Sequence, residues 1–128
     1  MESLSWKAVF DKPDSGIVLA SMLLDLAQKS GSQRSIFKAH GTLAAGFKMK
    51  SDLATALDHY EQCLVIAKSL NDRGRMANTF SNMSTVYKDL GDQPKALDLL
   101  QQSLRIDEEL GNKEGMAGTY NNIGNTYK

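Results

Sequence analysis

Apolar residues recur along this chain at the three- and four-residue spacing of amphipathic helices. Between Met76 and Leu90, for example, Phe80, Met83 and Tyr87 fall on one stripe. Five polar or glycine-containing breaks, SGS, MKSD, LNDRG, LGDQP and LGNKEG, separate six segments of this kind. The pattern predicts helices over residues 14–30, 33–49, 53–70, 73–90, 94–110 and 113–127.

The helical pattern itself repeats every forty residues. Residues 51–88 and 91–128, aligned at a shift of forty, are identical at 14 of 38 positions. A fainter copy precedes them, with Leu24 aligned under Leu64 and Leu104. A fixed period of this length is typical of stacked helical repeats. We therefore expect an all-α fold and one domain over residues 1–128. Its parts are a partial first repeat (1–31), two repeats (32–71 and 72–111) and the first helix of a truncated repeat (112–128).

The break LGDQP indicates how one helix ends and the next begins. Gly91 suits the left-handed conformation that follows a helix, Asp92 suits the N-cap, and Pro94 suits the first turn. Small residues also align across the repeats, and such columns indicate close contact between helix backbones. They are Ala44 with Ser84 and Gly124, and Gly16 with Ala56 and Ala96. We expect that replacing Ala96 or Gly124 with leucine would overpack the helix contact and destabilise the fold.

These residues resemble the tetratricopeptide repeat in a longer form of roughly forty residues. The family pattern consists of an aromatic residue, a Leu-Gly pair, a tyrosine, an LGD turn, an alanine and a later small residue. The corresponding residues here are, in the same order, Phe80, Met83-Ser84, Tyr87, Leu90–Asp92, Ala96 and Ser103. The first full copy departs from the pattern, with His40 in the aromatic column and MKSDL in place of the turn. The resemblance implies a right-handed superhelical solenoid of antiparallel helix pairs. It also implies a non-catalytic module that binds a protein or peptide in a concave groove.

By this resemblance the first helix of each repeat lines the groove. The polar residues expected there are Lys48, Asn78, Ser81, Asn82, Thr85, Lys88, Asn121, Asn122, Asn125 and Lys128. An asparagine amide can both donate to and accept from a peptide backbone. The lysines recur forty residues apart and would suit carboxylates. Both sets are also consistent with a polar surface that binds nothing, the lysines more so than the asparagines.

The opening segment KPDSGIVLASMLLDLAQKSGS has a narrower resemblance. It looks like the first helix of repeat regions that precede nucleotide cyclase, histidine kinase or DNA-binding domains in bacterial signalling proteins. The resulting hypothesis is the sensory or regulatory part of a larger signalling protein, with a catalytic domain beyond residue 128 as one option. The alternative is an oligomerisation module that brings attached output domains together.

Composition excludes several ligand classes. Fifteen basic and fifteen acidic residues cancel, so nucleic acid and anionic membrane surfaces are poor partners. No apolar run has the length of a membrane span, and we expect no membrane insertion. The single cysteine, Cys63, excludes an internal disulfide and fits a reducing, cytoplasmic location.

Candidate catalytic and metal-binding residues are few. His40 aligns with Phe80 and Tyr120, which favours a packing role, and His59 is assigned to a solvated face. The segment HYEQC provides only His59 and Cys63 as ligands, too few for a metal site. The acidic run at residues 107–110 is expected in solvent. We expect no catalytic site, cofactor or metal.

The last repeat stops after its first helix. Its apolar residues Tyr120, Ile123 and Tyr127 would then face water instead of a covering helix. We therefore interpret the chain as a piece of a longer protein and expect it to form homo-oligomers through this helix.

Overall fold

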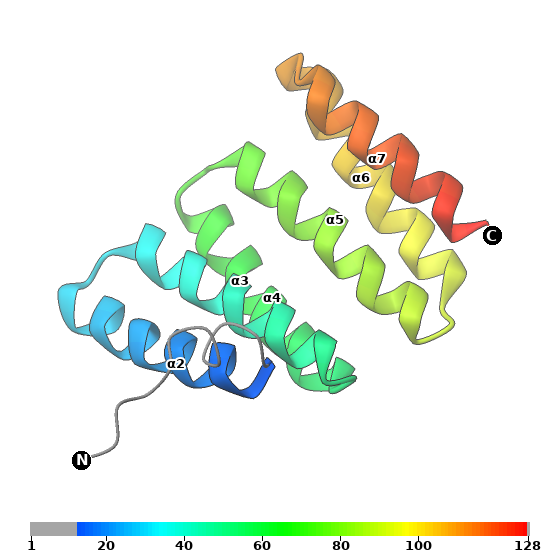
Figure 1. Cartoon of the computed structure of the whole chain (residues 1–128). Helices are drawn as coiled ribbons and strands as arrows, with labels where there is room; N and C mark the ends of the chain where they lie inside the picture. Colours follow the sequence, from blue (N-terminus) through cyan, green and yellow to red (C-terminus); the bar gives the residue numbers. More distant parts are fainter. Residues whose placement is uncertain (1–12, 128) are drawn as a thin grey trace. The chain divides into compact units, whose positions relative to one another are not determined.

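The structure, a computed structural model, describes residues 13–127, and these form six α-helices (Figure 1). Their bounds are α2 Pro13–Ser30, α3 Gln33–Met49, α4 Leu53–Ser69, α5 Arg73–Asp89, α6 Gln93–Leu110 and α7 Lys113–Thr126. Each bound lies within one residue of the range expected from the sequence, and no strand occurs in residues 13–127. The all-α prediction is confirmed.

The helices begin twenty residues apart because the same backbone device recurs at every junction. The residue in the left-handed region is Gly31, Ser51, Asn71, Gly91 or Gly111, with φ between 52° and 81°. The next residue is always polar, and its side chain accepts the backbone N–H three residues further on. These N-cap residues are Ser32, Asp52, Asp72, Asp92 and Asn112. One junction thus ends a helix and starts its successor.

The chain divides into two compact units, residues 1–63 and 64–128, with the boundary inside α4. In the first unit α2 and α3 are joined by a two-residue turn and pack side by side (Figure 1). The buried apolar side chains of this unit are Ala20, Ala27, Ala39, Leu43, Ala44, Ala56, Tyr60 and Cys63. The single-domain organisation and the repeat boundaries stay predictions.

In the second unit α5 packs against α6, and α7 packs against both (Figure 1). Its buried apolar side chains include Ala77, Phe80, Met83, Val86, Ala96, Leu99, Leu100 and Ile106. The one buried serine on α6, Ser103, donates its hydroxyl hydrogen to the Ala77 carbonyl at 2.9 Å. A polar side chain at a helix contact is therefore satisfied across that contact.

The two small-residue columns are only partly confirmed. Ala44, Ala56 and Ala96 are fully buried, as expected of positions where helices touch closely. The expectation for Gly124 is wrong, because this residue is exposed and an added Cβ would meet no atom within 4 Å. No described helix packs on that side of α7, so a leucine at Gly124 has nothing to overpack.

The expectation for the acidic run is also wrong at its first member. Asp107 is buried, and only 4% of the residue is exposed. Burial raises the pKa of its carboxyl group, and a hydrogen bond from the Asn112 amide at 3.4 Å opposes that rise. Glu108 and Glu109 are exposed as expected.

Among residues 13–127, no helix is both long enough and apolar enough to span a membrane.

Candidate functional site

The predicted groove residues on α5 and α7 lie in one unit, and the structure connects these two helices directly. The Asn122 amide nitrogen on α7 donates to the Ser81 hydroxyl oxygen on α5 at 3.0 Å. Both side chains are half-buried. This bond holds α5 and α7 side by side and places the polar residues next to them on neighbouring helices.

The side chains around this bond differ in their availability to a ligand. Asn78, Asn82 and Lys88 on α5 and Asn121 on α7 are exposed. Thr85 and Asn125 are half-buried, and the Thr85 hydroxyl donates to the Asn82 carbonyl at 2.7 Å. We call the set Asn78, Ser81, Asn82, Thr85, Asn121, Asn122 and Asn125 the amide surface.

Within the amide surface Asn122 has a structural task that sequence analysis missed. Its amide nitrogen is used to join two helices, whereas Asn82 and Asn121 present their amides to solvent. The amide surface therefore has three exposed asparagines, Asn78, Asn82 and Asn121, and one asparagine that is used to join helices. The bridge links residues 41 apart, close to one repeat period, and that spacing was the available signal.

Of the three lysines that recur forty residues apart, Lys48 and Lys88 lie among the described residues, in different units. Lys88 is exposed on α5. Lys48 is half-buried on α3, which belongs to the first unit, and Lys128 lies outside the described residues. That these lysines form one row stays a prediction.

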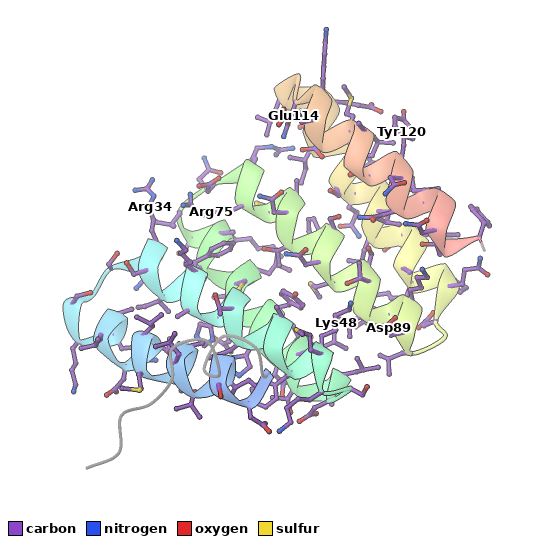
Figure 2. The ribbon with its side chains drawn as sticks, viewed as in Figure 1. Arg34, Lys48, Arg75, Asp89, Glu114 and Tyr120 are labelled. Atoms are coloured by element: carbon purple, nitrogen blue, oxygen red, sulfur yellow. The ribbon has the colours of Figure 1, made fainter. Side chains whose placement is uncertain are left out.

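The apolar residues expected to face water on α7 do so to different degrees. Tyr120 and Tyr127 are 58% and 68% exposed, and Ile123 is half-buried. At the equivalent positions of α5, Phe80 and Met83 are 8% and 6% exposed. Figure 2 shows Tyr120 on α7, the helix that α5 and α6 contact from the other side. The same apolar face is therefore buried on α5 and open on α7.

The structure also reveals a contact between the two histidines of the first unit. The Nδ1 atoms of His40 on α3 and His59 on α4 are 2.9 Å apart, so one ring donates a hydrogen bond to the other. The Phe47 ring stacks on His59 with a centroid distance of 5.6 Å. Burial lowers the pKa of both imidazoles, and the proximity of His59 lowers that of His40 further. The pair is held neutral, and His59 is half-buried rather than fully solvated.

Sequence reasoning had a usable signal for this pair. His40 replaces the aromatic residue of its column, and His59 stands where Leu19 and Leu99 stand in the other copies. Two polar substitutions at apolar columns of adjacent helices indicate a buried polar contact, because each would otherwise be unsatisfied.

The described residues contain no group of three or more His, Cys, Asp and Glu side chains arranged to hold a metal ion. The Cys63 thiol is buried and donates to the Phe37 carbonyl at 3.4 Å. Burial raises the pKa of Cys63 to about 12, so the thiolate that would bind a metal or attack an electrophile is scarce at neutral pH.

Comparison with known proteins agrees with this geometry. A tetratricopeptide-repeat family model matches residues 35–109, more than half of the chain. No curated protein matches the chain. The crystal structure of BtubC (BKLC) from P. vanneervenii is similar, with a TM-score of 0.66 and 19% identity over 94% of this chain. The match covers 59% of the BtubC chain, and at this identity it shows a shared fold alone. With its forty-residue period, its paired helices and this family match, the chain belongs to the tetratricopeptide-repeat family.

Proposed function

We propose that the chain binds an extended peptide or partner segment on the amide surface of α5 and α7. Membership of the family makes it a protein–protein interaction module; the location and the chemistry of the site are the proposal. The observation that carries it is the exposure of Asn78, Asn82 and Asn121 on two helices joined by the Asn122–Ser81 bond.

Asparagine amides suit a ligand that has no fixed side-chain chemistry. Each exposed amide can accept from a backbone N–H and donate to a backbone carbonyl, so a pair of them can hold a short extended segment. Lys88, exposed in the last turn of α5, would meet a carboxylate on such a ligand. The proposed role is non-catalytic, and the buried Cys63 and neutral histidine pair contribute nothing to it.

A peptide library displayed on phage tests the proposal. Peptides selected on the immobilised chain are synthesised, and their affinities are measured by calorimetry. The Asn82→Ala/Asn121→Ala variant should bind at least about fivefold more weakly, because one lost hydrogen bond is worth about 1 kcal/mol. Gln101→Ala, an exposed amide on α6, is the control and should bind as the parent does. Equal affinities for the double variant and the parent would place the site elsewhere.

The wider biological setting is a proposal from sequence. The resemblance of the opening segment, now seen as helix α2 and its following turn, supports a sensory or regulatory role in a bacterial signalling protein. In that setting a nucleotide cyclase, histidine kinase or DNA-binding domain belongs to the same parent protein, in the cytoplasm. Reading the gene downstream of codon 128 tests this, and a continuation without any output domain would contradict it.

Oligomerisation is the second candidate function. The observation that favours it is the open apolar face of α7, where Tyr120 and Tyr127 are mostly exposed. Apolar surface in water costs roughly 25 cal/mol per Å², so two large aromatic side chains favour any complementary cover.

A further inference from the structure

Helix α3 of the first unit has an unbalanced charge. Its sequence, QRSIFKAHGTLAAGFKM, contains Arg34, Lys38 and Lys48 but no acidic residue. Each of the other helices in residues 13–127 contains at least one aspartate or glutamate. Because the acidic and basic residues of the whole chain cancel, this helix is a local departure from a neutral protein.

Two of these cations lie one helical turn apart on one face of α3. Arg34 and Lys38 are four residues apart, so their side chains are neighbours on the helix surface. Both residues are exposed, and Figure 2 shows Arg34 at the N-terminal end of α3. Within residues 13–127 neither side chain has an ion-pair partner. We call Arg34 and Lys38 the cationic face.

The exposure of the cationic face is a property of these positions in the repeat. Forty residues further along, Asn78 is exposed and Gly74 is half-buried, although α6 and α7 both pack against that helix. Eighty residues further along, Glu114 and Gly118 are exposed. The position of Lys38 is therefore exposed in all three copies, including the copy that has a helix packed beside it.

The two cations occupy positions where they cost stability. Like charges four residues apart on a helix repel each other, and a cation in the first turn of a helix is disfavoured by the helix dipole. The first turn of α3 has no acidic residue to offset Arg34. On α5, by contrast, Arg73 pairs with Glu109 and Arg75 pairs with Asp72. A local cost without a compensating contact is typical of positions that serve binding.

The adjoining turns of α3 present no other strong recognition group. The Thr42 hydroxyl donates to the Lys38 carbonyl at 3.0 Å, and Gly41 and Ala45 have no side-chain hydrogen-bonding group. The amide surface has a polar side chain at each of the equivalent positions of α5. Recognition on α3 therefore depends on charge, whereas recognition on the amide surface depends on neutral hydrogen-bonding groups.

We propose that the cationic face binds an extended protein segment in which two acidic side chains flank one other residue. Alternate side chains of an extended segment point to the same side and are about 7 Å apart, which is close to the spacing of side chains one helical turn apart. One carboxylate can meet the planar guanidinium of Arg34, and the other can meet the ammonium of Lys38. This inference goes beyond the proposed function, since it concerns another unit, other residues and another class of ligand.

A phage library with Glu-x-Glu fixed at its centre and random flanking residues tests the proposal. The peptide selected on the immobilised chain is synthesised, and its affinity is measured at about 0.1 M and about 1 M salt. The Arg34→Gln/Lys38→Gln variant should bind about three- to tenfold more weakly at the lower salt concentration. The difference should nearly vanish at the higher concentration, because salt screens exposed charges.

A double-mutant cycle shows whether these cations meet those carboxylates. The same peptide with both glutamates replaced by glutamine should lose about as much affinity for the parent chain. Combining the two changes should cost little more than either alone, because each removes the same contacts. The control Lys68→Gln/Arg105→Gln removes equal charge from exposed positions of α4 and α6 and should bind as the parent does. Circular dichroism checks that each variant is folded.

Four outcomes would overturn the proposal. They are no enrichment of Glu-x-Glu peptides over a matched Gln-x-Gln library, equal affinities of the Arg34→Gln/Lys38→Gln variant and the parent, independent effects in the cycle, and equal weakening by the control. The Asn82→Ala/Asn121→Ala variant should bind the acidic peptide as the parent does. Failure of the amide surface and failure of the cationic face are therefore seen in different variants.

Discussion

At the scale of single residues, the most informative positions are those where one copy of the repeat departs from the others. His40 and His59 replace apolar residues of their columns, and they satisfy each other across α3 and α4 at 2.9 Å. Asp107 replaces the alanines at positions 27 and 67, and it is buried beside Asn112. Each departure introduces a titratable group into a helix contact, so each couples folding to pH.

The histidine pair should make the protein less stable in mild acid. The pKa of each ring is lowered in the folded state, so the unfolded chain binds more protons once the pH falls below about 6.5. Stability is therefore lost as the pH falls through the unfolded pKa toward the lower folded values. Asp58, whose charge favours protonation of His59, reduces the effect without reversing it.

The variant His40→Phe/His59→Leu introduces the residues found at the equivalent positions of other repeat copies. It should lose the part of the acid sensitivity that the histidine pair causes. Urea unfolding at pH 7.5 and pH 5 measures it. The decrease in unfolding free energy between the two pH values should be smaller in the variant than in the parent. An equal decrease in both proteins would show that other groups cause the acid sensitivity.

Two glycines of α7 should respond oppositely to alanine. A Cβ at Gly118 meets nothing within 4 Å, so Gly118→Ala should stabilise the helix by about 0.5–1 kcal/mol. A Cβ at Gly115 would lie 2.7 Å from the Asp107 carboxylate and from the Asn112 amide. Gly115→Ala should therefore be less stable than Gly118→Ala by at least about 1 kcal/mol in chemical denaturation. Equal stabilities would mean that Asp107 moves aside freely.

At the scale of helices, the junctions explain why α2 to α6 have nearly equal lengths of 17 or 18 residues. Each junction combines a left-handed residue with a polar N-cap, and the helix between two junctions buries a stripe of small and branched residues. Glycine occupies three of the five left-handed positions, and Ser51 and Asn71 occupy the others. Serine has a Cβ and tolerates this conformation poorly, whereas asparagine visits it more readily.

Replacing Ser51 with glycine should therefore stabilise the protein. The gain expected is about 0.5–1 kcal/mol, since the strain of the left-handed backbone is relieved while the unfolded chain gains some entropy. Asn71→Gly is the matched control and should gain less. Thermal unfolding of the two variants beside the parent measures both, and a larger gain at Asn71 would contradict the explanation.

At the scale of the whole molecule, the second unit has an apolar helix face that its other described helices do not cover. This is the face of α7 with Tyr120 and Tyr127. Association through this face would bury it. Because association stabilises only folded chains, it links stability to protein concentration.

The melting midpoint should therefore rise with the concentration of the parent chain. In Tyr120→Glu it should be independent of concentration, because the charge blocks the open face of α7. Differential scanning calorimetry over a hundredfold range of concentration distinguishes the two. A parent midpoint that does not change over that range would exclude association strong enough to matter for folding.

The periodic features were predictable from residues alone. Helix bounds, the N-caps at positions such as Asp92 and the buried alanines at positions 44, 56 and 96 all follow from local backbone preferences and a forty-residue period. Local rules suffice there because each junction involves only neighbouring residues. The amide surface was predicted as a set, from the first helices of the repeats.

Only the tertiary structure decided which residues at equivalent repeat positions are buried to the same extent. Phe80 and Tyr120 share a column, yet one is 8% exposed and the other 58%, because a neighbouring helix covers only the first. For the same reason Gly124 is open, whereas Ser84 of the same column is buried. The Asn122–Ser81 bridge and the histidine pair likewise depend on which helices meet and at what distance. A period in the sequence specifies what each repeat can bury, whereas only the packed neighbours determine what it does bury.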